Sequence, residues 1–143
     1  MKKIVFFFIL ISLLSNFFLA QDQTDKEKEA IKKAIMSYYH EGHVKSDPKL
    51  YEKVLHDEWK IFYLDKNGQL KTADKATYMS WYDPKKVDKT LKWETEFFYI
   101  DVSKYLASVK LKIKNQKFGY IDYFNLMKID GKWWVVHKIS HGL

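Results

Sequence analysis

The stretch FGYIDYFNLMKIDGKWWVVHKISH, residues 118–141, decides the fold. Two runs rich in β-branched and aromatic residues, Phe118 to Ile129 and Lys132 to His141, flank the dipeptide Asp130-Gly131. A two-residue Asp-Gly connection between such runs is typical of a tight turn that joins antiparallel strands. The stretch therefore predicts a long β-hairpin.

The residues before this hairpin predict helices first and further strands afterwards. Apolar side chains recur at helical spacing in three segments, and they alternate with polar side chains in later ones. The predicted helices are 24–42, 48–55 and 72–82, and the predicted strands are 59–64, 69–71, 91–102 and 105–114. This order indicates an α+β fold with three N-terminal helices packed on a curved antiparallel sheet.

Residues 1–20 have the pattern of a secretory signal peptide. Lys2 and Lys3 precede the apolar run Ile4 to Leu14, and a more polar stretch ends at Ala20. We expect a secreted or periplasmic protein with one domain at residues 21–143 and no stable membrane span after cleavage. The alternative is a retained anchor, because Ile4 to Ala20 is about as long as the shortest membrane-spanning helices. The chain has no cysteine, which excludes a lipoprotein acylated at cysteine and also excludes disulfides.

Composition argues against a nucleic-acid partner and draws attention to the aromatic side chains. All 25 basic residues are lysine, whereas base and phosphate recognition favours arginine. The chain has ten Phe, ten Tyr and five Trp, some of them in the apolar run at residues 4–14. The others either fill the core or line a cavity for a flat or hydrophobic ligand.

Two stretches carry a resemblance to a known superfamily. YYHEGHVKSDPKLYEKVLH, residues 38–56, and DYFNLMKIDGKWWVVHKISH, residues 122–141, resemble the opening and the closing hairpin of cone-shaped folds related to nuclear transport factor two and ketosteroid isomerase. The second stretch is similar to the subgroup labelled "putative lumazine-binding". The resemblance implies a cone-shaped roll around a pocket, in a superfamily of enzymes, binding modules and proteins of unknown role. His56-Asp57-Glu58 departs from the His-Pro-Asp often found there.

The hairpin register predicts an aspartate beside two histidines. An uninterrupted ladder places the side chains of Asp122, His137 and His141 on one apolar face. The predicted pairs are Asp122 with Ile139, Phe124 with His137, and Tyr120 with His141. A carboxylate beside an imidazole can act in general acid–base catalysis. The resemblance implies such a role, because the superfamily includes isomerases, dehydratases and cyclases. The alternative is a polar pair that tethers the sheet or orients a ligand.

Other side chains are candidates for contact with a ligand. They are Tyr39, His43, Trp59, Tyr78, Trp81, Phe97, Tyr120 and Phe124. His40 and His43 form an H-x-x-H pattern, but Gly42 between them indicates a helix end, so we predict no metal site. Phosphate-binding loops and dinucleotide fingerprints are absent from the sequence, and we expect no cofactor.

The sequence leaves three hypotheses for function. The first is an exported protein that binds a small hydrophobic or aromatic molecule, with no catalysis assumed. The second is an isomerase-, dehydratase- or cyclase-like enzyme that uses Asp122 with His137 or His141. The third is a protein-interaction module, which would follow if aromatic side chains filled the cone. A homodimer through the outer face of the sheet is a further expectation.

Overall fold

The computed structural model describes residues 21–143, so the predicted signal peptide lies outside the described residues. The described chain starts with a long helix, which is α-helical over 21–34, π-helical over Ile35–His40 (η1) and α-helical again over Glu41–Lys45 (α2). The predicted range of 24–42 is therefore too short at both ends. Ser46, with a left-handed φ of 49°, follows the last turn. No helix within residues 21–143 has the length and hydrophobicity needed to cross a membrane.

Gly42 has a different role from the helix terminator that we predicted. A Cβ atom at this position would lie 2.6 Å from the ring of Tyr51, so only glycine lets that ring pack against the helix backbone. Tyr51 belongs to the short helix Pro48–Tyr51 (α3), which begins after the predicted cap. There the Asp47 carboxylate accepts a hydrogen bond from the Lys49 amide.

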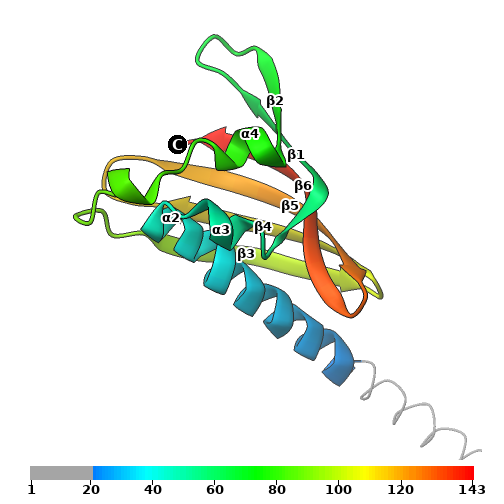
Figure 1. The fold of residues 1–143 in the computed structure, drawn as a ribbon. Coiled ribbons are helices and arrows are strands. Elements are labelled where there is room, and N and C mark those ends of the chain that lie inside the picture. The colour runs from blue at the N-terminus through cyan, green and yellow to red at the C-terminus, as the bar shows by residue number, and fades with distance from the viewer. Residues whose placement is uncertain (1–20) are drawn as a thin grey trace, which may run out of the picture.

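Six strands form one curved, open sheet, and the expected α+β cone is confirmed (Figure 1). The strands are Leu55–Leu64 (β1), Leu70–Asp74 (β2), Glu94–Ser103 (β3), Leu106–Lys114 (β4), Gly119–Ile129 (β5) and Lys132–Gly142 (β6). Their spatial order is β2-β1-β6-β5-β4-β3. The sheet is mixed rather than wholly antiparallel, because β1 runs parallel to β6.

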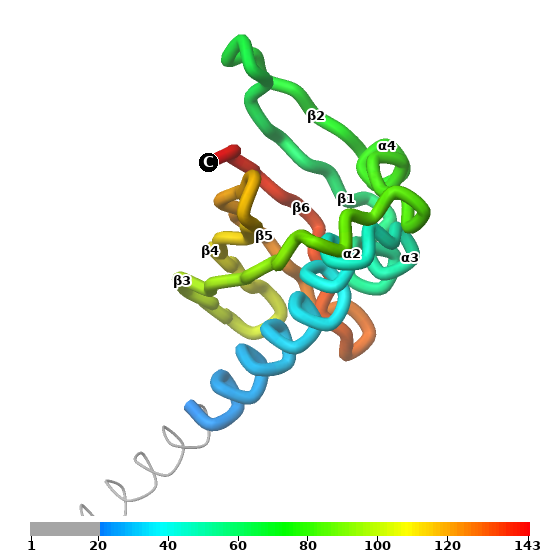
Figure 2. The backbone as a smooth tube through the Cα atoms, turned by 90° about the vertical axis from the view of Figure 1, so that its left-hand side faces the viewer, coloured from blue at the N-terminus to red at the C-terminus, as the bar shows by residue number. Residues whose placement is uncertain are grey.

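The third predicted helix is shorter than 72–82 because β2 continues to Asp74. The Asp74 side chain then accepts a hydrogen bond from the Thr77 amide and starts the helix Lys75–Met79 (α4). A short 3₁₀-helix, Pro84–Lys86 (η2), follows it. The chain then runs from α4 through the loop that contains η2 to β3 (Figure 2).

The helices cover one face of the sheet, and the core lies between them. Ile31, Ile35 and Tyr39 from the long helix are fully buried against inner-face side chains of the strands. The alternation predicted for 105–114 is present: Val109 and Leu111 are fully buried. Glu27, near the N-terminal end of the helix, connects it to the sheet. Its carboxylate accepts hydrogen bonds from Lys128 Nζ at 2.6 Å and from Trp133 Nε1 at 2.7 Å.

A β-bulge changes the register of the closing hairpin. Pairing follows the expected ladder from the pair Ile129–Lys132 to the pair Leu126–Val135. The next residue, Asn125, pairs with His137, so Val136 is an extra residue on β6. Beyond this bulge every predicted pair is shifted by one residue. Asp122 faces Ser140, Phe124 faces Lys138 and Tyr120 faces Gly142. Because a one-residue shift moves side chains to the opposite face, Lys138 and Ser140 take the inner positions predicted for the histidines.

Candidate functional site

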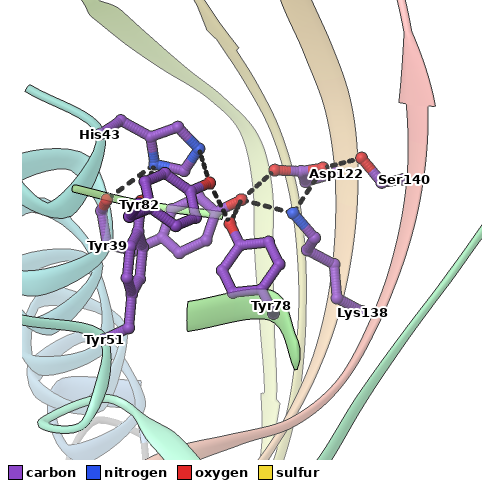
Figure 3. A network of polar contacts seen from close by, with 8 residues as sticks. All are labelled: Tyr39, His43, Tyr51, Tyr78, Tyr82, Asp122, Lys138 and Ser140. Carbon is purple, nitrogen blue, oxygen red and sulfur yellow. Dashed lines mark hydrogen bonds and ion pairs between the residues drawn. The ribbon is translucent and has the colours of Figure 1, made fainter. Parts of the chain in front are cut away.

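The bulge separates Asp122 from both histidines with which it was predicted to pair. His137 pairs with Asn125 on the outer face and its ring packs on Phe62 at 5.3 Å, while His141 is exposed. The expected Asp–His pair is therefore wrong. Asp122 is fully buried on the inner face, where its carboxylate accepts 2.6 Å hydrogen bonds from Tyr39 Oη and Ser140 Oγ (Figure 3).

Lys138 supplies the positive charge that accompanies this carboxylate. Its Nζ lies 3.5 Å from Asp122 Oδ1 and donates a 2.6 Å hydrogen bond to Tyr39 Oη. The ammonium also lies 5.1 Å from the ring centre of Tyr39 and 5.0 Å from that of Tyr78. Burial lowers the pKa of Lys138, and the charge of Asp122 only partly opposes this effect. Within residues 21–143, Lys138 is thus a desolvated lysine that forms an ion pair with Asp122.

Three tyrosine hydroxyls form a chain of hydrogen bonds that starts beside Asp122 and Lys138. Tyr82 Oη donates to Tyr78 Oη at 2.8 Å, and Tyr78 Oη donates to Tyr39 Oη at 3.5 Å (Figure 3). Burial raises the pKa of all three phenols above the ordinary value of 10. They therefore stay protonated near neutral pH and serve as hydrogen-bond donors and acceptors.

His43 is a neutral imidazole held in one orientation. Its Nδ1 lies 3.0 Å from the backbone oxygen of Tyr39 and 2.9 Å from Tyr51 Oη, and its Nε2 lies 3.2 Å from Tyr82 Oη. Burial lowers the pKa of His43 to about 4. Because a carbonyl oxygen only accepts, the hydrogen of the neutral ring is on Nδ1, and Nε2 is the unprotonated nitrogen that faces the Tyr82 hydroxyl.

Two adjoining hollows open next to this network. The inner hollow, of about 270 Å³, has Lys138 and Ser140 among its lining residues. Its other lining residues are His43, Ile61, Tyr63, Leu64, Tyr78, Trp81, Tyr82, Tyr120 and Gly142. The outer hollow, of about 310 Å³, includes Trp93 and Phe118 and borders the loop that contains η2. The hollows share His43, Trp81, Tyr82 and Tyr120, so they are direct neighbours.

The predicted ligand contacts divide into two groups. The first group lines the hollows: His43, Tyr78, Trp81 and Tyr120. The second group packs in or against the core: Tyr39, Trp59, Phe97 and Phe124. Tyr39 nevertheless takes part in the site through its hydroxyl. Sequence reasoning missed Lys138, Ser140 and Tyr82, because the first two reach the inner face only through the bulge.

The side chains of the site can form hydrogen bonds and stack on flat rings. Within residues 21–143 no three His, Cys, Asp or Glu side chains converge as a metal site would require. The lining of the inner hollow includes a basic residue, Lys138, and a neutral imidazole, His43, among aromatic side chains. Such a wall holds a flat ring by stacking, while its polar groups fix the orientation of the ring.

Comparison with solved structures places this fold among proteins described as NTF2-like. One is an NTF2-like protein of unknown function from Shewanella baltica OS155, with 26% identity, a TM-score of 0.71, and coverage of 82% of this chain and 94% of that one. Another, of unknown function from Silicibacter pomeroyi DSS-3, has 12% identity, a TM-score of 0.75 and coverage of 84% and 98%. Comparison with curated proteins finds no match.

The curved sheet, its helical cover and the hollow between them define the class of this protein as an NTF2-like α+β cone. A family model described as "Putative lumazine-binding" matches residues 26–141, which include every side chain of the site. The chain belongs to this family.

Proposed function

We propose that this protein is an exported binding protein for a small, flat heteroaromatic molecule with ring carbonyl groups, and that binding needs no catalytic step. The observation that carries the proposal is the position of Lys138, which places a buried ammonium at the wall of an aromatic hollow. A carbonyl oxygen can accept from this ammonium, and a ring N–H can donate to His43 Nε2. Stacking on the surrounding rings supplies the remaining affinity.

The family description narrows the choice of ligand. Lumazine is a bicyclic pteridine that carries two ring carbonyls and ring N–H groups, which complement the cation and the acceptor of the inner hollow. A hollow of about 270 Å³ matches one small ring system rather than a steroid-sized molecule. We therefore propose pteridine-like bicyclic compounds as the ligand class.

The other two hypotheses receive less support. The enzyme hypothesis depended on Asp122 beside His137 or His141, and neither histidine lies on its face of the sheet. The protein-interaction hypothesis required aromatic side chains to fill the cone, whereas the inner and outer hollows are open. Ligand binding is the function that this geometry favours.

Isothermal titration with lumazine tests the proposal, and Lys128→Met provides a matched control. Lys128 is also ion-paired and partly buried, but it lies at the Glu27 end of the cone. We expect the wild type and Lys128→Met to bind equally, and Lys138→Met to bind about tenfold or more weakly, because a charged hydrogen bond is lost. Circular dichroism checks that each variant is folded. A wild type that gives no binding heat overturns the proposal.

Export is proposed on the pattern of residues 1–20, with cleavage after Ala20. Expression of the full chain in a secreting host, followed by N-terminal sequencing of the exported protein, provides the test. We expect Gln21 as the first residue. A product that keeps Met1 and stays in the membrane fraction would instead indicate a retained anchor.

We also propose a homodimer through the outer face of the sheet. Tyr123 and Ile139 pair across β5 and β6 on that face, and they are 41% and 51% exposed. Met127 on β5, two residues beyond the polar Asn125, is also 42% exposed on this face. Light scattering should give a dimer mass for the wild type and a monomer mass for Ile139→Lys. A wild type that is monomeric at micromolar concentration overturns the dimer.

A further inference from the structure

We infer that Lys138 is a nucleophilic amine that forms a reversible imine with an aldehyde or ketone group of a flat aromatic molecule in the inner hollow. The inference rests on the proposed function for the location of the ligand, and it adds a covalent step that binding alone does not need. Lys138 is 3% exposed, and it lines the inner hollow. A carbonyl compound in this hollow therefore lies next to the side chain of Lys138.

The surroundings of Nζ are those that favour a free amine. Asp122 faces it from β5, Tyr39 from the long helix and Tyr78 from α4. The only negative charge in this set is the carboxylate of Asp122, which also accepts hydrogen bonds from Tyr39 and Ser140. An ammonium that is buried away from water and shares its counter-ion in this way loses its proton more easily than a surface lysine.

Lys138 and Asp122 supply and accept every proton that imine formation requires. The ammonium gives one proton to Asp122, which lies 3.5 Å away, and the neutral amine attacks the carbonyl carbon. The carbonyl oxygen takes a proton from the attacking nitrogen and becomes the hydroxyl of a carbinolamine. Asp122 returns its proton to this hydroxyl, which leaves as water. The sum converts an ammonium and a carbonyl into an iminium and one water, with no oxidant, reductant or cofactor.

Tyr39 is suited to assist this transfer as a positioning residue. Its hydroxyl lies 2.6 Å from Lys138 Nζ and 2.6 Å from Asp122 Oδ2, so it bridges the amine and the acid. Burial and the charge of Asp122 both raise the pKa of its phenol, which keeps the hydroxyl protonated. The hydroxyl can therefore hold the amine close to the carboxylate throughout the step.

Reductive trapping tests the inference on the wild-type chain. The protein is incubated near neutral pH with 2-naphthaldehyde and sodium cyanoborohydride, digested with chymotrypsin, and analysed by mass spectrometry for alkylated lysines. Lys128, which is ion-paired with Glu27 and 24% exposed at its side chain, is the internal comparison. Lys138→Arg keeps the positive charge and removes the nucleophile. An excess of lumazine is added to a parallel sample as a competitor.

We expect alkylation of Lys138 to exceed that of Lys128 by about tenfold. Lumazine should suppress the modification of Lys138 and leave that of Lys128 unchanged. Equal or weaker modification of Lys138 in a wild type that still binds lumazine overturns the imine and leaves the proposed function intact. Selective modification of Lys138 without lumazine binding supports the imine and overturns the proposed ligand class.

Discussion

The phenol of Tyr39 on the N-terminal helix donates a 2.6 Å hydrogen bond to the carboxylate of Asp122 on β5, and both residues are fully buried. This contact joins segments 83 residues apart in the chain. Lys138 and Ser140 complete the same cluster from β6, so helix and sheet meet at a polar centre inside an apolar core. The site is thus also a structural connection between the two layers of the fold.

Removal of the Tyr39 hydroxyl should destabilise the fold. In Tyr39→Phe the ring still packs against Phe124, but Asp122 and Lys138 each lose a buried partner. We expect the free energy of unfolding, measured by urea denaturation, to fall by about 1–3 kcal/mol. Tyr38→Phe is the control, because that ring is only partly buried, and a loss below about 0.5 kcal/mol is expected. Equal losses in the two variants would contradict this role.

Asp122 and Lys138 should be strongly coupled in a double-mutant cycle. Asp122→Asn leaves a buried cation without its counter-ion, and Lys138→Met leaves a buried anion without its partner. Each single change should destabilise the protein by about 3–5 kcal/mol in urea denaturation. The double variant removes both charges and should be more stable than the sum of the two losses predicts. Strictly additive losses would show that the pair does not interact.

The buried imidazole of His43 should make stability depend on pH. Its pKa falls from 6.5 to about 4 in the fold because of burial. Between these values the unfolded chain binds more protons than the folded one, so acidification through this window favours unfolding. We expect the wild type to lose about 2 kcal/mol more than His43→Asn between pH 7 and pH 5 in urea denaturation. Parallel pH profiles of the two proteins would rule out a neutral, buried His43.

Local sequence patterns were enough to predict the order of the elements. The period-two alternation around Val109 and the turn at Asp130-Gly131 correspond to β4 and to the β5–β6 turn. The parallel pairing of β1 with β6 was not predicted, because it joins distant segments and leaves no periodic pattern of its own. The long-range bonds of Glu27 escaped prediction for the same reason.

The candidate site was harder to predict, since its composition depends on a single extra residue. With Val136 outside the ladder, the inner face receives Lys138 and Ser140 instead of the two histidines. Apolar and polar side chains alternate in either register, so the sequence of this hairpin does not show the bulge. The aromatic wall, by contrast, was identified in part, because His43, Tyr78, Trp81 and Tyr120 all line the hollows.

The position of the ligand site can be tested most directly by NMR of the imidazole groups. In a sample with ¹⁵N-labelled histidine, addition of lumazine should shift the His43 ring signals, because His43 lines both hollows. Signals of His137 and His141 should stay in place, since His137 lies on the outer face and His141 is exposed. Shifts confined to His137 and His141, or no shift at any histidine, would contradict a ligand site beside His43 and Lys138.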